Sequence, residues 1–186
     1  MTDLPTAVFL FTDVVGSTGM WDRDADAMDR AMTAHDQILY NSITARGGTV
    51  FKHTGDGICA TFGEAVGSLQ AAIQGQRLLE AVKWPVPTGP RVRMALHAGE
   101  FREHSGDYFG LDVCLVRRIL DLTPGGSVLI TEPAVALLDE ATLNHLWLLD
   151  LGDCHLRDIS APIRIHRLVA FPIGPYLEPV EFVNPD

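Results

Sequence analysis

The 186-residue sequence is poor in basic side chains, and lysine is especially rare. It contains 14 Lys and Arg against 24 Asp and Glu, and its formal charge is −10. Lys52 and Lys83 are its two lysines. An acidic chain lacks the basic face that nucleic acids and anionic membranes require. We therefore expect neither nucleic acid nor a membrane as a partner. If a lysine has a functional role, Lys52 and Lys83 are the two candidates.

Long hydrophobic runs and a secretion signal are also missing. No segment reaches the roughly 20 apolar residues of a membrane span. The apolar run at 7–11 has no basic segment before it. The three cysteines, Cys59, Cys114 and Cys154, lack the spacing of a metal site. We therefore expect a cytoplasmic protein with reduced thiols.

The composition indicates one folded domain followed by a short tail. Hydrophobic residues make up 47% of the chain and charged residues 20%, which excludes a disordered chain. The length suits a single domain. We place this domain at residues 1–170, and a proline-containing acidic tail at residues 171–186.

The apolar pattern predicts an α+β fold. Apolar runs and alternation predict strands at 7–11, 49–54, 58–62, 91–99, 128–131, 146–151 and 163–169. Three- and four-residue spacing predicts helices at 20–46, 64–82, the second half of 108–122, and 132–138. Hairpins and helices interleave without strict βαβ repetition. This order indicates a mostly antiparallel sheet flanked by helices.

Two acidic residues stand where predicted strands end. Asp13 follows strand 7–11, and Asp56 lies in the turn between strands 49–54 and 58–62. If these strands pair, the two carboxylates converge and repel unless a divalent cation lies between them. Carboxylate oxygens suit Mg²⁺ or Mn²⁺. The alternative is that Asp13 caps a helix and Asp56 only fills a turn.

The segment 14–18, VVGST, leads from the first of these aspartates toward a predicted helix. Backbone N–H groups at the start of a helix can contact a phosphate. The segment lacks the GxxxxGK[ST] pattern, which excludes a P-loop.

Four motifs in a fixed order resemble the catalytic domain of the class III adenylyl/guanylyl cyclases. They are FTDVVGST, KHTGDG, HAGE and DYFGLDVCLVRR, and the resemblance runs from about residue 7 to residue 169. It implies a ferredoxin-like, or palm-like, mostly antiparallel fold that functions as a dimer. It also identifies residues 1–170 as a cyclase catalytic domain.

The resemblance assigns a metal and phosphate site to the first two motifs. Asp13 and Asp56 would bind two Mg²⁺ or Mn²⁺ ions per site, and the carbonyl of Val14 would be a further metal ligand. The loop residues implied to contact substrate are Val14, Gly16, Ser17 and Thr18.

Lys52 and Asp107 match the two base-specifying positions of the family. Lysine donates to adenine N1, and aspartate accepts from the N6 amino group. Guanine inverts this pattern, with a donor at N1 and an acceptor at O6, so the pair would meet guanine wrongly. The alternative is a solvated strand lysine and a turn aspartate. The pair therefore predicts ATP as substrate.

The last motif supplies one matching residue and one departure. Arg118 matches the arginine that stabilises charge on the α-phosphate during transfer. The alternative is a surface arginine paired with Asp112 or Asp121. Cys114 stands where the family has an asparagine that orients the ribose, and a thiol is a weak donor. Loss of one oriented donor costs roughly 10²–10³ in rate.

The family also uses a lysine near the C-terminal strands to bind the triphosphate, and this chain has none there. Arg157 is the predicted replacement, with His155 as the second choice. His53 and His97 lie within the motifs, and we assign them no catalytic role.

Together these residues predict a homodimeric adenylyl cyclase that converts ATP to 3′,5′-cyclic AMP and pyrophosphate. The alternative is a catalytically weak or inactive cyclase-like module for nucleotide binding or dimerisation. Cys114 and the missing lysine favour this alternative. A cyclic-dinucleotide synthase would require a GG[DE]EF signature, which the sequence lacks.

Overall fold

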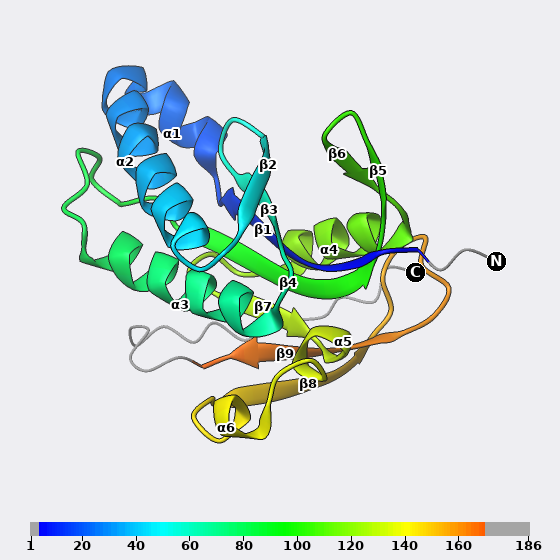
Figure 1. Cartoon of the computed structure of the whole chain (residues 1–186). Helices are drawn as coiled ribbons and strands as arrows, with labels where there is room; N and C mark the ends of the chain where they lie inside the picture. Colours follow the sequence, from blue (N-terminus) through cyan, green and yellow to red (C-terminus); the bar gives the residue numbers. More distant parts are fainter. Residues whose placement is uncertain (1–3, 170–186) are drawn as a thin grey trace.

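A twisted sheet between two helical layers forms the centre of the molecule (Figure 1). The computed structural model describes residues 4–169. The predicted tail, 171–186, lies outside the described residues, as do the first three residues and residue 170.

Seven strands make the main sheet, in the order β2-β3-β1-β4-β7-β9-β8. Their bounds are β1 Thr6–Val14, β2 Thr49–His53, β3 Ile58–Phe62, β4 Val92–Glu100, β7 Val128–Thr131, β8 Leu148–Cys154 and β9 Ile163–Leu168. The pair β4–β7 is parallel, and the other five neighbouring pairs are antiparallel. The predicted mostly antiparallel sheet is therefore confirmed.

Six helices accompany the sheet within residues 4–169. They are α1 Ser17–Arg23, α2 Ala25–Thr44, α3 Ala65–Ala81, α4 Leu111–Leu122, α5 Glu132–Val135 and α6 Glu140–Leu143. The order β1-α2-β2-β3-α3-β4, with β3 and β1 in the middle of these four strands, is the ferredoxin-like arrangement. Among the described helices, none combines the length and apolar character needed to cross a bilayer.

The prediction of one continuous helix over 20–46 was wrong. The chain breaks at Asp24, whose backbone is extended with φ −160°. The Asp24 side chain accepts a hydrogen bond from the N–H of Ala27 at 2.9 Å and so caps α2. The cap separates α2 from α1. Helix α1 begins at Ser17, directly after the loop that follows Asp13.

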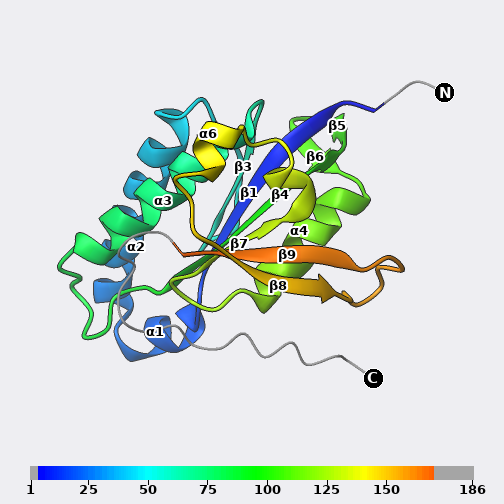
Figure 2. The ribbon, with the colours of Figure 1, turned by 90° about the horizontal axis from the view of Figure 1, so that it is seen from below.

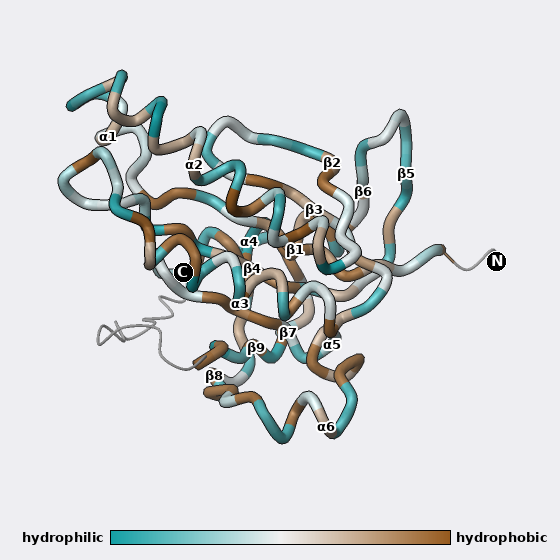
Figure 3. Tube along the Cα trace, turned by 60° about the vertical axis from the view of Figure 1, so that its left-hand side comes forward, coloured by the Kyte–Doolittle hydropathy of each residue, from teal (hydrophilic) through white to brown (hydrophobic). Residues whose placement is uncertain are grey.

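Both faces of the central strands are buried, one under α2 and α3 and the other under α4 (Figure 2). On β4, Met94 and Leu96 pack in the α2–α3 core, while Ala95 belongs to the core beneath α4. Ala95 and His97, on the opposite face of β4, are also buried, because α4 covers that face. The hydrophobic stretches follow these strands in Figure 3.

A short hairpin that the sequence did not predict projects beside the sheet. Strands β5 Arg102–His104 and β6 Asp107–Phe109 pair only three residues each and form a separate two-stranded sheet. The hairpin is largely hydrophilic (Figure 3). The ring of Tyr108 packs against Phe51 of β2 and Phe101, with ring centroids 4.6 and 4.8 Å apart. These rings anchor the hairpin beside β2.

Candidate active site

The structure brings the two predicted metal-binding aspartates to the same end of the sheet. Asp13 is the next-to-last residue of β1, and Asp56 lies in the loop joining β2 to β3. The N–H of Val14 donates to the carbonyl of Asp56 at 3.1 Å. The hydroxyl of Ser17 donates to Asp56 Oδ2 at 2.5 Å. The loop after Asp13 therefore binds directly to the second aspartate.

This close approach depends on a glycine. A Cβ added to Gly57 would lie 2.0 Å from the carbonyl oxygen of Thr12, a contact that no side chain can make. The Thr12 hydroxyl also accepts from the N–H of Ile58 at 2.9 Å. The loop of Asp56 is thus held against the end of β1 by backbone contact.

Arg93 is part of this end of the sheet, although we did not single it out from the sequence. It lies opposite Asp13 in the β1–β4 register. Its Nε and Nη2 lie 2.8 and 2.6 Å from Asp13 Oδ2, and its Nη1 donates to the carbonyl of Asp121 at 3.0 Å. Asp13 is 7% exposed, so its carboxylate is neutralised by a neighbour in a nearly dry environment. Predicting this contact required the pairing of β1 with β4, which sequence periodicity does not provide.

The two predicted base-reading residues contact each other. Lys52 on β2 and Asp107 at the start of β6 form a direct ion pair. The hydrogen bond from Lys52 holds the pKa of the Asp107 carboxyl below its usual value, and the bond to Asp107 raises the pKa of Lys52. Their side chains remain 50% and 31% exposed, so a ligand can reach both. The adjacent rings of Phe51 and Tyr108 hold their two strands together.

The residues predicted on α4 lie one helical turn apart, on the same side of the helix. Cys114 is exposed. Arg118 donates from Nη2 to Asp158 Oδ2 at 3.2 Å. Its partner is therefore neither Asp112 nor Asp121, the two alternatives considered above. Instead, Asp121 lies near Arg117 and Arg93, and Asp112 binds the N–H of Glu100 at 2.7 Å.

Arg157, the predicted triphosphate-binding residue, lies in the loop between β8 and β9. Its Nε is 3.6 Å from Asp158 Oδ2, the same oxygen that binds Arg118. The structure therefore brings Arg157 and Arg118 to one aspartate. His155, the second choice, is exposed in the same loop.

The two motif histidines have structural contacts. Burial lowers the pKa of His97, although Asp112 opposes the shift. Its Nδ1 lies 2.9 Å from the hydroxyl of Thr131 at the end of β7. His53 contacts Asp36 of α2 at 2.9 Å, and its Nδ1 accepts from the N–H of Gly55 at 3.1 Å. His53 thus stabilises the loop that carries Asp56.

The described part of the chain contains no group of three or more His, Cys, Asp or Glu side chains that could hold a metal ion. The carboxylates of Asp13 and Asp56, with the Val14 carbonyl between them in the chain, are an all-oxygen donor set of the kind that Mg²⁺ and Mn²⁺ accept. Mg²⁺ usually takes one or two carboxylates and completes its shell with substrate phosphates and water. The residues present therefore fit a metal that is bound together with a nucleotide.

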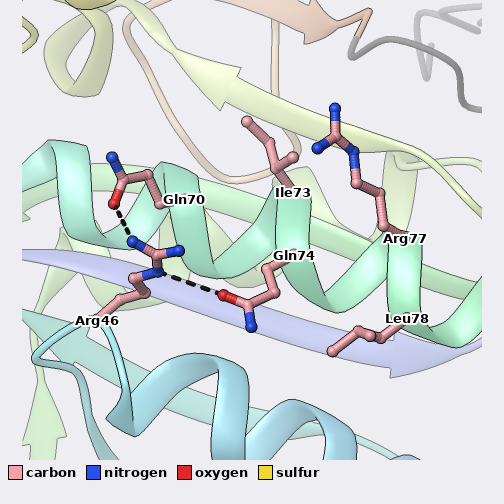
Figure 4. Close-up of a pocket in the computed structure, with 6 residues that line it drawn as sticks. All are labelled: Arg46, Gln70, Ile73, Gln74, Arg77 and Leu78. Atoms are coloured by element: carbon pink, nitrogen blue, oxygen red, sulfur yellow. Dashed lines mark hydrogen bonds between the residues drawn. The ribbon is translucent and has the colours of Figure 1, made fainter.

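A cavity of about 390 Å³ lies elsewhere, on the outer side of α3 (Figure 4). The Arg46 guanidinium spans this surface and is bound by Gln70 at 2.9 Å and Gln74 at 3.3 Å. Arg77 points away from Arg46 in the same view. None of the predicted site residues lines this cavity.

Comparison with solved structures identifies the fold. The chain superposes on adenylate cyclases of Trypanosoma brucei, solved in their monomeric state, with a TM-score of 0.85 and 23% identity over 92% of each chain. The chain has the catalytic-domain fold of the class III nucleotide cyclases. Guanylyl cyclase domains match this fold as well, including one from Catenaria anguillulae in complex with GTP, with a TM-score of 0.75 and 12% identity over 88% of this chain and 95% of that one.

Curated sequences support the same resemblance. An uncharacterised protein of Mycobacterium tuberculosis is 30% identical over 165 residues, which are 88% of this chain and 55% of that protein. A putative adenylate cyclase of Rhizobium meliloti is 26% identical over 86% of this chain and 27% of that protein. This chain spans about half the length, or less, of these curated relatives. No protein-family model matches it. The solved structures show the fold of a nucleotide cyclase domain, and they include both adenylyl and guanylyl cyclases.

Proposed function

We propose that the protein is an adenylyl cyclase that converts ATP to 3′,5′-cyclic AMP and pyrophosphate in a homodimer. The observation that carries this proposal is the contact between Lys52 and Asp107. A fixed donor beside a fixed acceptor matches N1 and the N6 amino group of adenine. Guanine has a donor at N1 and an acceptor at O6. Its donor would therefore meet the lysine donor, and its acceptor would meet the aspartate acceptor.

Asp13 and Asp56 are proposed to hold Mg²⁺ or Mn²⁺, two ions per site, with the carbonyl of Val14. When bound, these ions favour ionisation of the ribose 3′-hydroxyl and neutralise the triphosphate. Arg93 binds Asp13 Oδ2, so this contact would have to loosen if the carboxylate bound a metal. The N–H groups of Ser17 and Thr18, in the first turn of α1, are the proposed backbone contacts to phosphate, next to Gly16.

The proposed reaction is an in-line displacement. The 3′-hydroxyl gives up its proton to water and its oxygen forms a bond to the α-phosphorus, while the bond from that phosphorus to the bridging oxygen breaks and pyrophosphate leaves. Arg118 contacts the α-phosphate oxygens as charge builds on them, and its guanidinium stays protonated throughout. Arg157 binds the departing phosphates. Cys114 faces the ribose and gives it only a weak hydrogen bond.

The homodimer follows from the two half-sets of site residues within one chain. In the family, the metal aspartates of one chain and the base readers and arginine of the other form each site. A two-fold axis that brings Asp13 of one protomer to Arg118 of its partner also produces the reverse contact. One chain therefore supplies both halves of two equivalent sites.

Incubation of the purified protein with Mn²⁺-ATP and, separately, Mn²⁺-GTP tests the proposal. Chromatography of the products should show cyclic AMP and little cyclic GMP. Faster turnover of GTP would overturn the assignment of Lys52 and Asp107. The absence of any cyclic nucleotide would favour the second proposal, a cyclase-like module that binds nucleotide or dimerises without efficient turnover. Cys114, exposed at the asparagine position, is the observation that favours this second function.

Replacing the thiol at this position should increase the rate. We expect Cys114→Asn to raise kcat by about tenfold or more, because an amide donates a much stronger hydrogen bond to the ribose. Cys114→Ala is the matched control, since it removes the thiol without adding a donor, and its kcat should not rise. Initial rates at saturating Mn²⁺-ATP measure both variants. An unchanged or lower kcat for Cys114→Asn would contradict the alignment of Cys114 with the family asparagine.

A further inference from the structure

One aspartate of the β8–β9 loop binds two arginines at once. Oδ2 of Asp158 accepts a hydrogen bond from Arg118 Nη2 at 3.2 Å and lies 3.6 Å from Arg157 Nε. Arg118 belongs to α4, whereas Arg157 and Asp158 belong to the loop, so the carboxylate joins two separate parts of the fold.

These two arginines are the ones proposed to bind the phosphates of the substrate. A guanidinium binds carboxylate and phosphate oxygens through the same set of N–H donors. The Asp158 carboxylate therefore marks an anion position between Arg118 and Arg157. It also differs from the other acids of the site, because Asp13 and Asp107 have proposed roles toward metal and base whereas Asp158 has none.

We propose that Asp158 sets the affinity for the triphosphate: its carboxylate occupies the position between Arg118 and Arg157 that a substrate phosphoryl group takes, and substrate binding displaces it. This inference rests on the proposed function for the roles of the two arginines. It adds to that function a residue of the chain itself that competes with the substrate for Arg118 and Arg157.

The exposure of the three side chains makes such an exchange feasible. The side chains of Arg118, Arg157 and Asp158 are 42%, 77% and 68% exposed. An ion pair this open to water is weak. A polyanion that offers several oxygens to both guanidinium groups can therefore replace a single carboxylate.

The backbone at Asp158 supplies a clean variant. Its φ is 63°, in the left-handed region that glycine adopts without strain and that few other residues favour. The backbone alone would thus favour glycine at this position. Asp158→Gly should leave the loop conformation intact while it removes the carboxylate, and Asp158→Asn removes only the charge.

Titration of the 186-residue chain with magnesium tripolyphosphate, followed by calorimetry, tests the inference without any catalytic step. Both Asp158→Asn and Asp158→Gly should bind the probe about two- to tenfold more tightly than the unmodified chain, the range expected for loss of one or two exposed ion pairs. Asp153→Asn, on the adjacent strand, removes the same charge and should change the affinity by much less. In an Arg118→Ala background the gain should shrink, because one of the two arginines is gone.

Kinetics supply a second readout. The KM for Mn²⁺-ATP should fall by a similar factor in both Asp158 variants, with kcat nearly unchanged, whereas a merely structural role for Asp158 would raise KM or lower kcat. Unchanged or weaker tripolyphosphate binding in both variants, or no binding by any of the proteins, overturns the inference. The titration remains decisive even if no cyclic nucleotide forms, so the failure of this inference and that of the proposed function are distinguishable.

Discussion

An equal mixture of Asp13→Asn and Arg118→Ala chains should recover about a quarter of the unmodified activity, although neither chain is active alone. Random pairing makes half of the dimers mixed. Each mixed dimer has one site with both defects and one site with neither. Asparagine is chosen at position 13 because Asp13 is buried against Arg93, and an amide oxygen still accepts a hydrogen bond there. Cyclic AMP formation, measured after the two chains have been allowed to exchange, reports the recovery.

The control for this experiment mixes Asp13→Asn chains with chains that carry both Asp13→Asn and Arg118→Ala. Every dimer then lacks Asp13 on both sides, so no activity should return. Equal recovery of activity in the control and the test mixture would contradict a site shared between two chains. So would the absence of recovery in the test mixture once exchange of chains has been shown. A dimer in which each site lies within one chain would give the latter result.

Exchange of the base-reading pair should have the second large effect. In a Lys52→Glu, Asp107→Asn chain, the glutamate accepts from guanine N1–H and the asparagine amide donates to O6. We expect the ratio of ATP to GTP turnover to fall by at least about a hundredfold, because adenine then meets an acceptor at N1 and leaves polar groups unpaired. Rates of cyclic AMP and cyclic GMP formation from equal concentrations of both nucleotides measure the change.

Lys83→Glu is the matched control for the charge reversal, because Lys83 is the other lysine and is exposed outside the site. It should retain the preference for ATP. A double variant that still prefers ATP would show that other residues select the base, and the proposal for Lys52 and Asp107 would then fall.

The sequence predicted the strands and long helices well because each carries a repeated apolar signal. Strand 128–131, for example, has the bounds of β7. The break at Asp24 was missed because the cap depends on one side chain, which apolar spacing does not register. The β5–β6 hairpin was missed because three-residue strands with charged side chains carry no periodic signal.

The site shows the same division. Local motifs predicted Asp13, Asp56, Lys52 and Asp107. In the fold, the end of β1 that carries Asp13 contacts the loop of Asp56, and Lys52 contacts Asp107. The sequence did not predict Arg93 or Asp158 as site residues. Each of them reaches the site through a contact between distant segments, β1 with β4 and α4 with the β8–β9 loop. Such contacts depend on strand order and loop path, which periodicity alone leaves open.

The independence of the β5–β6 hairpin has an evolutionary consequence. It carries Asp107, yet ring contacts and an ion pair, and no ladder of backbone hydrogen bonds, join it to the main sheet. Substitutions or insertions at its turn, Ser105–Gly106, can therefore accumulate without shifting the register of any core strand. The part of the molecule proposed to read the base can therefore vary in sequence while the end of the sheet that carries Asp13 and Asp56 stays constant. Related domains that turn over different purine nucleotides can arise on one scaffold by changes confined to this hairpin and to the strand beside it.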